Sequence, residues 1–131
     1  MLTIRVTGVN ELLSKFNNIP PKLETNLNIG IQKAIMDIQM ETRPITPLDT
    51  GRLRASIGGG TYKGGSYSEG SGTKFSNLYG EIGSNVEYAY LVHEKNIRHV
   101  HGDWKFLERG AALAQPGIMR DFKLLIKQAI E

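Results

Sequence analysis

The chain has 131 residues, no cysteine, and 16 basic against 13 acidic residues, which gives a formal net charge of +3. This length predicts a single domain over residues 1–131, able to bury a hydrophobic core without disulfides or metal clips. The missing cysteines exclude disulfides, thiolate nucleophiles and Cys-ligated zinc, and no stretch approaches the ~18 apolar residues of a membrane span. We therefore expect a protein made in a reducing cytoplasm, with no membrane partner.

The first third of the chain predicts a strand, a short helix and one long helix. Residues 2–6 alternate apolar and polar side chains, as a half-buried strand does. The apolar spacing lengthens over residues 9–16, which predicts a short helix capped by Asn10 and ended by Pro20. From residue 22 to 43 an apolar face recurs at helical steps, which predicts the core helix. That face comprises Leu23, Leu27, Ile31, Ala34, Ile35 and Ile38.

Three further apolar residues of this predicted helix, Ile29, Met36 and Met40, lie off that face. A helix with two apolar sides is either deeply buried in its own subunit or shared with another subunit. Both interpretations stay open from the sequence. The three residues are therefore candidate interface residues.

The tripeptide Asp49-Thr50-Gly51 is the one that retroviral-type aspartic proteases use to place a catalytic carboxylate. Such a loop ends an apolar strand in an almost all-β chain and is followed by a small residue. Here it follows a long predicted helix and precedes the bulky Arg52. Asp49 can instead accept hydrogen bonds from later backbone N–H groups, and Gly51 is free to take a positive φ. We interpret the tripeptide as a structural turn and cap.

A possible strand passes through Leu53, Ala55 and Ile57 and leads into a Gly/Ser-rich segment at residues 58–76. This composition does not stay ordered by its own contacts, so we predict a flexible loop or long hairpin arm that a neighbouring subunit orders. Its sparse anchors are Tyr62, Tyr67 and Phe75. Gly65 stands where a phosphate-binding loop needs lysine, so no nucleotide cofactor is expected.

The last part of the chain predicts a strand at residues 78–83 and a short helix around residues 88–92, which Asn85 could cap. After a basic turn at residues 95–101, a helical segment is expected to break near Pro116. The terminal helix carries one apolar face, with two apolar residues outside it. The face comprises Ile118, Phe122, Leu125, Ile126 and Ala129, and the outliers are Met119 and Ile130.

The histidines raise the question of a metal site. His99 follows His93 by six residues, whereas the zincin motif needs four, so the spacing argues against that site. The alternative is a basic turn in which Arg98, His99 and His101 meet another subunit or DNA. Trp104 and Met119 are likewise candidate interface residues, and no metal is expected.

Five features follow one another along nearly the whole chain. They are the stretch TPLDTGRLRASI, the glycine-rich segment, the stretches GEIGSNVEYAYLVHE and WKFLERGA, and the terminal helix. Together they resemble the small head-tail joining, or tail-completion, proteins of long-tailed bacteriophages. Two signatures carry the resemblance, Pro-x-Asp-Thr-Gly-x-Leu-Arg-x-Ser at residues 47–56 and Tyr-Ala-x-x-Val-x-Glu at residues 88–94. Both are architectural in that family. Lys95 and Trp104 depart from its pattern, so the turn at residues 95–103 is the least transferable part.

The resemblance implies an α+β fold, in which a small, mostly antiparallel sheet packs on one long helix beside a C-terminal helix. It implies a structural protein without enzymatic activity, forming a homo-oligomeric ring, a hexamer by resemblance, at the head-tail junction of the virion. Its partners would be connector or neck proteins and the tail tube or tail terminator protein, with DNA passing through the lumen. Two other classes stay open: a hydrolase using Asp49 or the histidines, and a basic nucleic-acid-binding module.

Overall fold

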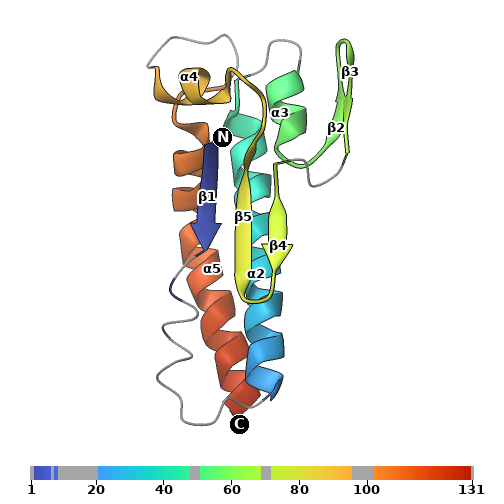
Figure 1. Ribbon diagram of the computed structural model, residues 1–131. Helices are drawn as coiled ribbons and strands as arrows, with labels where there is room; N and C mark the ends of the chain where they lie inside the picture. The colour runs from blue at the N-terminus through green and yellow to red at the C-terminus, as the bar shows by residue number, and fades with distance from the viewer. Residues whose placement is uncertain are drawn as a thin grey trace.

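The computed structural model of the chain describes residues 2–6, 8, 21–47, 51–68, 72–95 and 102–130. Two long helices lie side by side behind a small sheet (Figure 1). Helix α2 spans Pro21–Thr42 and helix α5 spans Phe106–Ile130, and the two run antiparallel. The long helix, the small antiparallel sheet and the C-terminal helix confirm the predicted α+β fold.

The main sheet has three antiparallel strands in the order β1-β5-β4. Strand β1 spans Leu2–Val6, β5 spans Tyr79–Ser84 and β4 spans Lys74–Ser76. Both strands predicted around these positions, at residues 2–6 and 78–83, are therefore present. The sheet lies directly on α2, because a Cβ added at Gly80 of β5 would collide with Ile31 and Ile35 of that helix.

The hydrophobic core lies between the sheet and the two long helices. Every residue of the apolar face predicted for residues 22–43 is buried, which confirms that face. On α5, Phe106 and Leu107 are fully buried and Ala129 is buried near the other end. The predicted face of the terminal helix is partly or fully buried, and the two predicted outliers, Met119 and Ile130, are exposed.

The predicted strand ending at Ile57 is wrong, because Arg52–Ser56 forms the short helix α3. Leu53, Ala55 and Ile57 are all buried, and a short apolar run of this kind does not by itself distinguish a strand from a helix. Gly51 precedes α3 as its N-cap residue with φ 88°, which confirms the positive φ predicted for this glycine. Asp49 and Thr50 lie outside the described residues.

Helix α4 spans Ala89–Glu94, and its N-cap residue is Tyr88 rather than the predicted Asn85. The backbone N–H of Val86 instead donates to Ser84 Oγ, in a turn that precedes the first residue of the helix. The predicted break at Pro116 is also wrong, since α5 is continuous through it. Pro116 is exposed, so water can solvate the carbonyl that loses its donor, while Ala114 on the opposite side stays buried.

The glycine-rich segment at residues 58–76 contains three short strands. Strands β2 (Gly60–Tyr62) and β3 (Gly65–Tyr67) pair as an antiparallel hairpin, and β4 joins the main sheet. The β2–β3 hairpin projects beside α3, away from the main sheet (Figure 1). The flexibility of this segment stays a prediction, and the short helix predicted at residues 9–16 lies outside the described residues.

Helices α2 and α5 approach closely at two glycines. Gly110 packs on Thr42, where an added Cβ would collide with the threonine side chain and its Cα, and Gly30 packs under the ring of Phe122. Asn26 Nδ2 also donates a 2.8 Å hydrogen bond to the carbonyl of Leu125. These contacts fix the register between the two helices.

We predict that Gly110→Ala lowers the free energy of unfolding by about 1 to 3 kcal/mol, because the new methyl group overpacks the contact with Thr42. Gly117→Ala on the same helix is the matched control. Only the flexible end of Arg120 lies within 4 Å of its added Cβ, so we expect it to raise stability by about 0.5 to 1 kcal/mol. Urea unfolding measures both, and equal effects would contradict this account of the helix contact.

Candidate assembly interface

The candidate interface residues on α2 are exposed in the structure. Ile29, Met36 and Met40 are 47, 60 and 70% exposed, although all three belong to a helix whose opposite face is buried. Phe75 on β4 and Met119 on α5 are about half exposed. Their role in an interface stays a prediction, and Arg98, His99 and His101 lie outside the described residues.

The β2–β3 hairpin has a fixed root and an exposed tip. The rings of Tyr62 and Tyr67 lie 5.5 Å apart, and Tyr67 packs against the hydrophobic core. Arg43 Nη2 donates to the carbonyl of Gly59 at 3.0 Å, just before the hairpin. The turn at Lys63 and Gly64 is exposed. The hairpin therefore presents a short polar tip from an anchored base.

Arg52 of α3 links the hairpin to the segment before α4. Its guanidinium makes a bidentate contact with the Glu87 carboxylate, at 2.7 and 3.0 Å, and lies 5.7 Å from the centre of the Tyr88 ring. Hydrogen bonds to Glu87 and Tyr67 raise the pKa of Arg52, and the bond from Arg52 lowers the pKa of Glu87. Three separate segments are thus held by one cation.

Trp104 is partly buried, and its role in an interface stays a prediction. The charged groups of Lys105 and Arg109 lie 5.4 and 6.0 Å from its ring centre. Arg109 also donates to Asp103 Oδ2 at 2.7 Å, and the Asp103 backbone N–H donates to the Ile45 carbonyl. Asp103 and Arg109 also line an open hollow of about 420 Å³, together with Ile45, Ala112 and Leu113.

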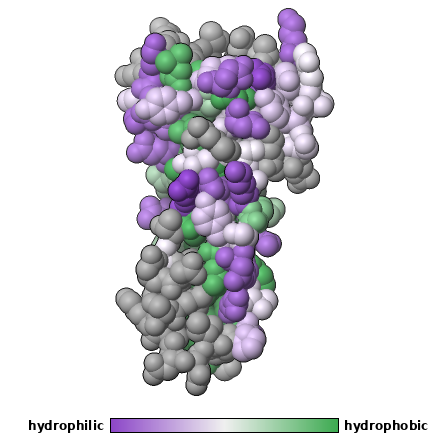
Figure 2. Space-filling view, in the orientation of Figure 1, coloured by the Kyte–Doolittle hydropathy of each residue, from purple (hydrophilic) through white to green (hydrophobic). Residues whose placement is uncertain are grey.

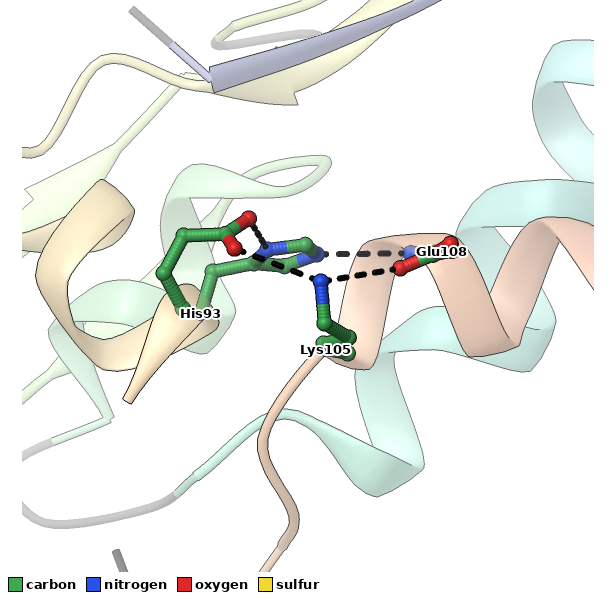
Figure 3. A network of polar contacts seen from close by, with 4 residues as sticks. His93, Lys105 and Glu108 are labelled. Atoms are coloured by element: carbon green, nitrogen blue, oxygen red, sulfur yellow. Dashed lines mark hydrogen bonds and ion pairs between the residues drawn. The ribbon is translucent and has the colours of Figure 1, made fainter. Parts of the chain in front are cut away.

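A polar network around His93 joins α4 to the beginning of α5 (Figure 3). The imidazole is buried, and its Nε2 accepts the backbone N–H of Glu108 at 3.4 Å. Nδ1 therefore carries the proton and donates to Glu94 Oε1 at 2.8 Å. Lys105 Nζ lies 3.2 Å from Glu94 Oε2 and 3.4 Å from Glu108 Oε2. His93 is thus a connector between two helices.

The charges of this network shift one another's titration. Hydrogen bonds from His93 and Lys105 hold the pKa of the Glu94 carboxyl below its ordinary value. The bond to Glu94 likewise raises the pKa of the Lys105 ammonium. Both shifts favour the charged forms that make the contacts, so the network is strongest near neutral pH.

Within the described ranges, no three His, Asp or Glu side chains gather closely enough to hold a metal ion. None of the helices described is both long and apolar enough to cross a bilayer. Sequence reasoning missed two exposed apolar residues of α5, Leu113 and Leu124. Their spacing of eleven residues places them on one side of the helix, and this periodicity was the available signal.

Glu94→Gln tests the network through pH. Because the pKa of Glu94 is lowered in the folded protein, its contribution to stability is present above the ordinary value of 4.5 and is lost as pH falls through the folded value. We expect the variant to be less stable than the wild type at pH 7 and the difference to vanish in acid. Urea unfolding at several pH values measures this. Glu24→Gln, outside the network, is the control, and parallel curves for wild type and Glu94→Gln would contradict the assignment.

Comparison with known proteins bears on what these surfaces do. No curated protein and no solved structure is significantly similar to the chain. One family model matches residues 10–110, and its description is "Bacteriophage HK97-gp10, putative tail-component". The match covers most of the chain, including both signatures on which the resemblance to phage joining proteins rests. The chain therefore belongs to the HK97-gp10-like family of bacteriophage tail components.

Proposed function

We propose that this protein is a structural component of the head-tail junction, where copies form a closed ring that joins the capsid connector to the tail. Membership of a phage tail-component family and the resemblance to head-tail joining proteins support this role. The observation that carries it is the amount of apolar surface left exposed, with ten large apolar side chains exposed among the described residues. Such surface marks sites of protein contact.

The ring needs contacts that differ on the two sides of each subunit, because closed rings form through heterologous interfaces. The β2–β3 hairpin supplies one candidate side, with Tyr62 at its exposed end and Phe75 on the nearby edge strand β4. The hollow lined by Ile45, Arg109 and Leu113 supplies a concave surface at α5. In this proposal the hairpin of one subunit contacts its neighbour, and a hexamer follows the resemblance.

The partners proposed are the connector or neck proteins on one side and the tail tube or tail terminator protein on the other. The basic turn at residues 95–101 would face another subunit or the DNA passing through the ring. On the side of the subunit that carries the sheet, hydrophilic residues are spread over the described surface with small hydrophobic patches between them (Figure 2). A surface of this kind suits contacts with several partners rather than one large permanent interface.

The position in the virion is tested by withholding this protein from the phage that encodes it. We expect filled heads and full-length tails that fail to join, and joining should return when purified protein is added. Electron microscopy with a specific label should mark the junction in complete particles. Label along the tail tube, or normal particles without the protein, would overturn the proposal.

The hairpin is tested by replacing residues 61–66 with a two-residue turn, which leaves Tyr67 on the core and Gly60 opposite it. We expect the melting temperature of the free chain to change little, because the removed residues are mostly exposed, whereas head-tail joining should fail. Thr61→Ser, which keeps the hairpin, is the control. Efficient joining by the shortened protein would show that the hairpin is dispensable.

A further inference from the structure

Five exposed apolar side chains lie on one side of the helix pair, away from the sheet. Ile29, Met36 and Met40 form a stripe on α2, and Leu113 and Leu124, 59 and 53% exposed, follow α5. We call this surface the helical back face. Nothing in the described part of the chain covers these five side chains.

The register between the two helices determines which exposed residues of α2 and α5 lie at the same level, that is, at the same height along the helix axes. Thr42 lies against Gly110 and Gly30 against Phe122, so Met40 is level with Leu113 and Ile29 is near the level of Leu124. Met40 and Leu113 together line a hollow of about 270 Å³. Halfway between the two apolar levels, Lys33 pairs with Asp121 at 3.2 Å. The face therefore has apolar ends and a charged middle.

Three charged residues that line this hollow have no ion pair with any described residue. Two are acids on α2, Asp37 and Glu41, and the third is Arg120 on α5. Arg120 adjoins Asp121 and so lies near the level of Lys33, on one side of Met36 along the helix axis. Asp37 and Glu41 lie on the other side. The face thus carries an unpaired positive charge on one side of Met36 and two unpaired negative charges on the other.

We propose that two copies of this chain pair through their helical back faces, about a twofold axis that passes between the levels of Lys33 and Met36. A twofold operation there brings Arg120 of each copy toward Asp37 and Glu41 of the other. It also turns the Met40 and Leu113 end of one face toward the Ile29 and Leu124 end of the other. Because both the charges and the apolar groups are matched by one operation, the face complements itself, as an isologous interface must.

The shape of the face also suits a second helix pair. Gly117 lies in the hollow at the level of Met36, and an added Cβ there would find only the flexible end of Arg120 within 4 Å. A glycine at this place leaves room for a methionine from the other copy, and the unbranched methionine side chain adapts to such gaps. This isologous contact shares Leu113 with the hollow proposed for the ring, but Met40, Gly117 and Arg120 do not line that hollow, so variants at these three positions test the pair separately.

The first test is the mass of the free, full-length chain by analytical ultracentrifugation, without other virion proteins. We expect two chains for the wild type and one chain for Met40→Glu, which places a charge in the apolar end of the contact. Leu91→Glu on α4 changes an exposed leucine outside the face and should leave the pair intact. A wild type that stays a single chain at all concentrations, or a mass other than two chains, would overturn the proposal.

A charge exchange tests the orientation of the pair. Arg120→Glu alone places like charges opposite Asp37 and Glu41, and Asp37→Arg with Glu41→Arg places like charges opposite Arg120. We expect each variant to weaken its own pairing by about tenfold or more. Mixed in equal amounts, the two variants should form a one-to-one pair with restored affinity. Two variants that pair as the wild type does, or a mixture that stays unpaired, would contradict the twofold arrangement.

Gly117→Gln gives a variant that is expected to fold better than the wild type. Glutamine is a stronger helix former than glycine, so its melting temperature should rise. The added side chain fills the hollow at the proposed axis, so pairing should be lost. A stabilised Gly117→Gln variant that still pairs would overturn the proposal, because pairing would then not depend on the hollow that the glutamine fills.

Discussion

The close antiparallel contact between α2 and α5 is the constraint on which the rest of the structure depends. Two glycines, Gly30 and Gly110, let the helices approach nearer than larger residues would permit, since both would place an added Cβ against a side chain of the other helix. The contact leaves Thr42 Oγ1 buried without a hydrogen-bond partner, a cost that the surrounding packing offsets. It fixes which residues of the two helices share a level, and so which surfaces the subunit presents.

Polar chemistry in this protein is used to join elements. His93 connects α4 to α5, Arg52 connects α3 to the segment before α4, and Glu81 of β5 accepts a hydrogen bond from Tyr79 while pairing with Arg5 of β1. In each case a hydrogen bond lowers the pKa of a carboxyl, that of Glu94, Glu87 or Glu81.

Five of the exposed apolar residues lie on the helical back face, and Phe75 lies on the edge strand β4. In the proposed ring, the projecting β2–β3 hairpin and the hollow lined by Arg109 and Leu113 form the two unlike sides of the contact. The helical back face combines apolar groups, a hollow and charges of both signs on one surface, which suits contact with a copy of itself. In the arrangement we propose, the isologous pair and the ring use surfaces that share Leu113 and differ in their other residues.

The sequence by itself determined the features that depend on local periodicity and backbone freedom. The buried face of α2, strands β1 and β5 and the positive φ of Gly51 follow from residue type and spacing along one element, whereas the exposure of Met36 and Met40 was left open by the sequence. Only the tertiary structure decided that residues 52–56 form a helix and that α5 continues through Pro116, because burial on one side overrides a short or weak local signal. The hollow between Met40 and Leu113, and the meeting of His93 with the beginning of α5, join residues far apart in the sequence. Their positions depend on the helix register, which packing at the two glycines sets and no local pattern records.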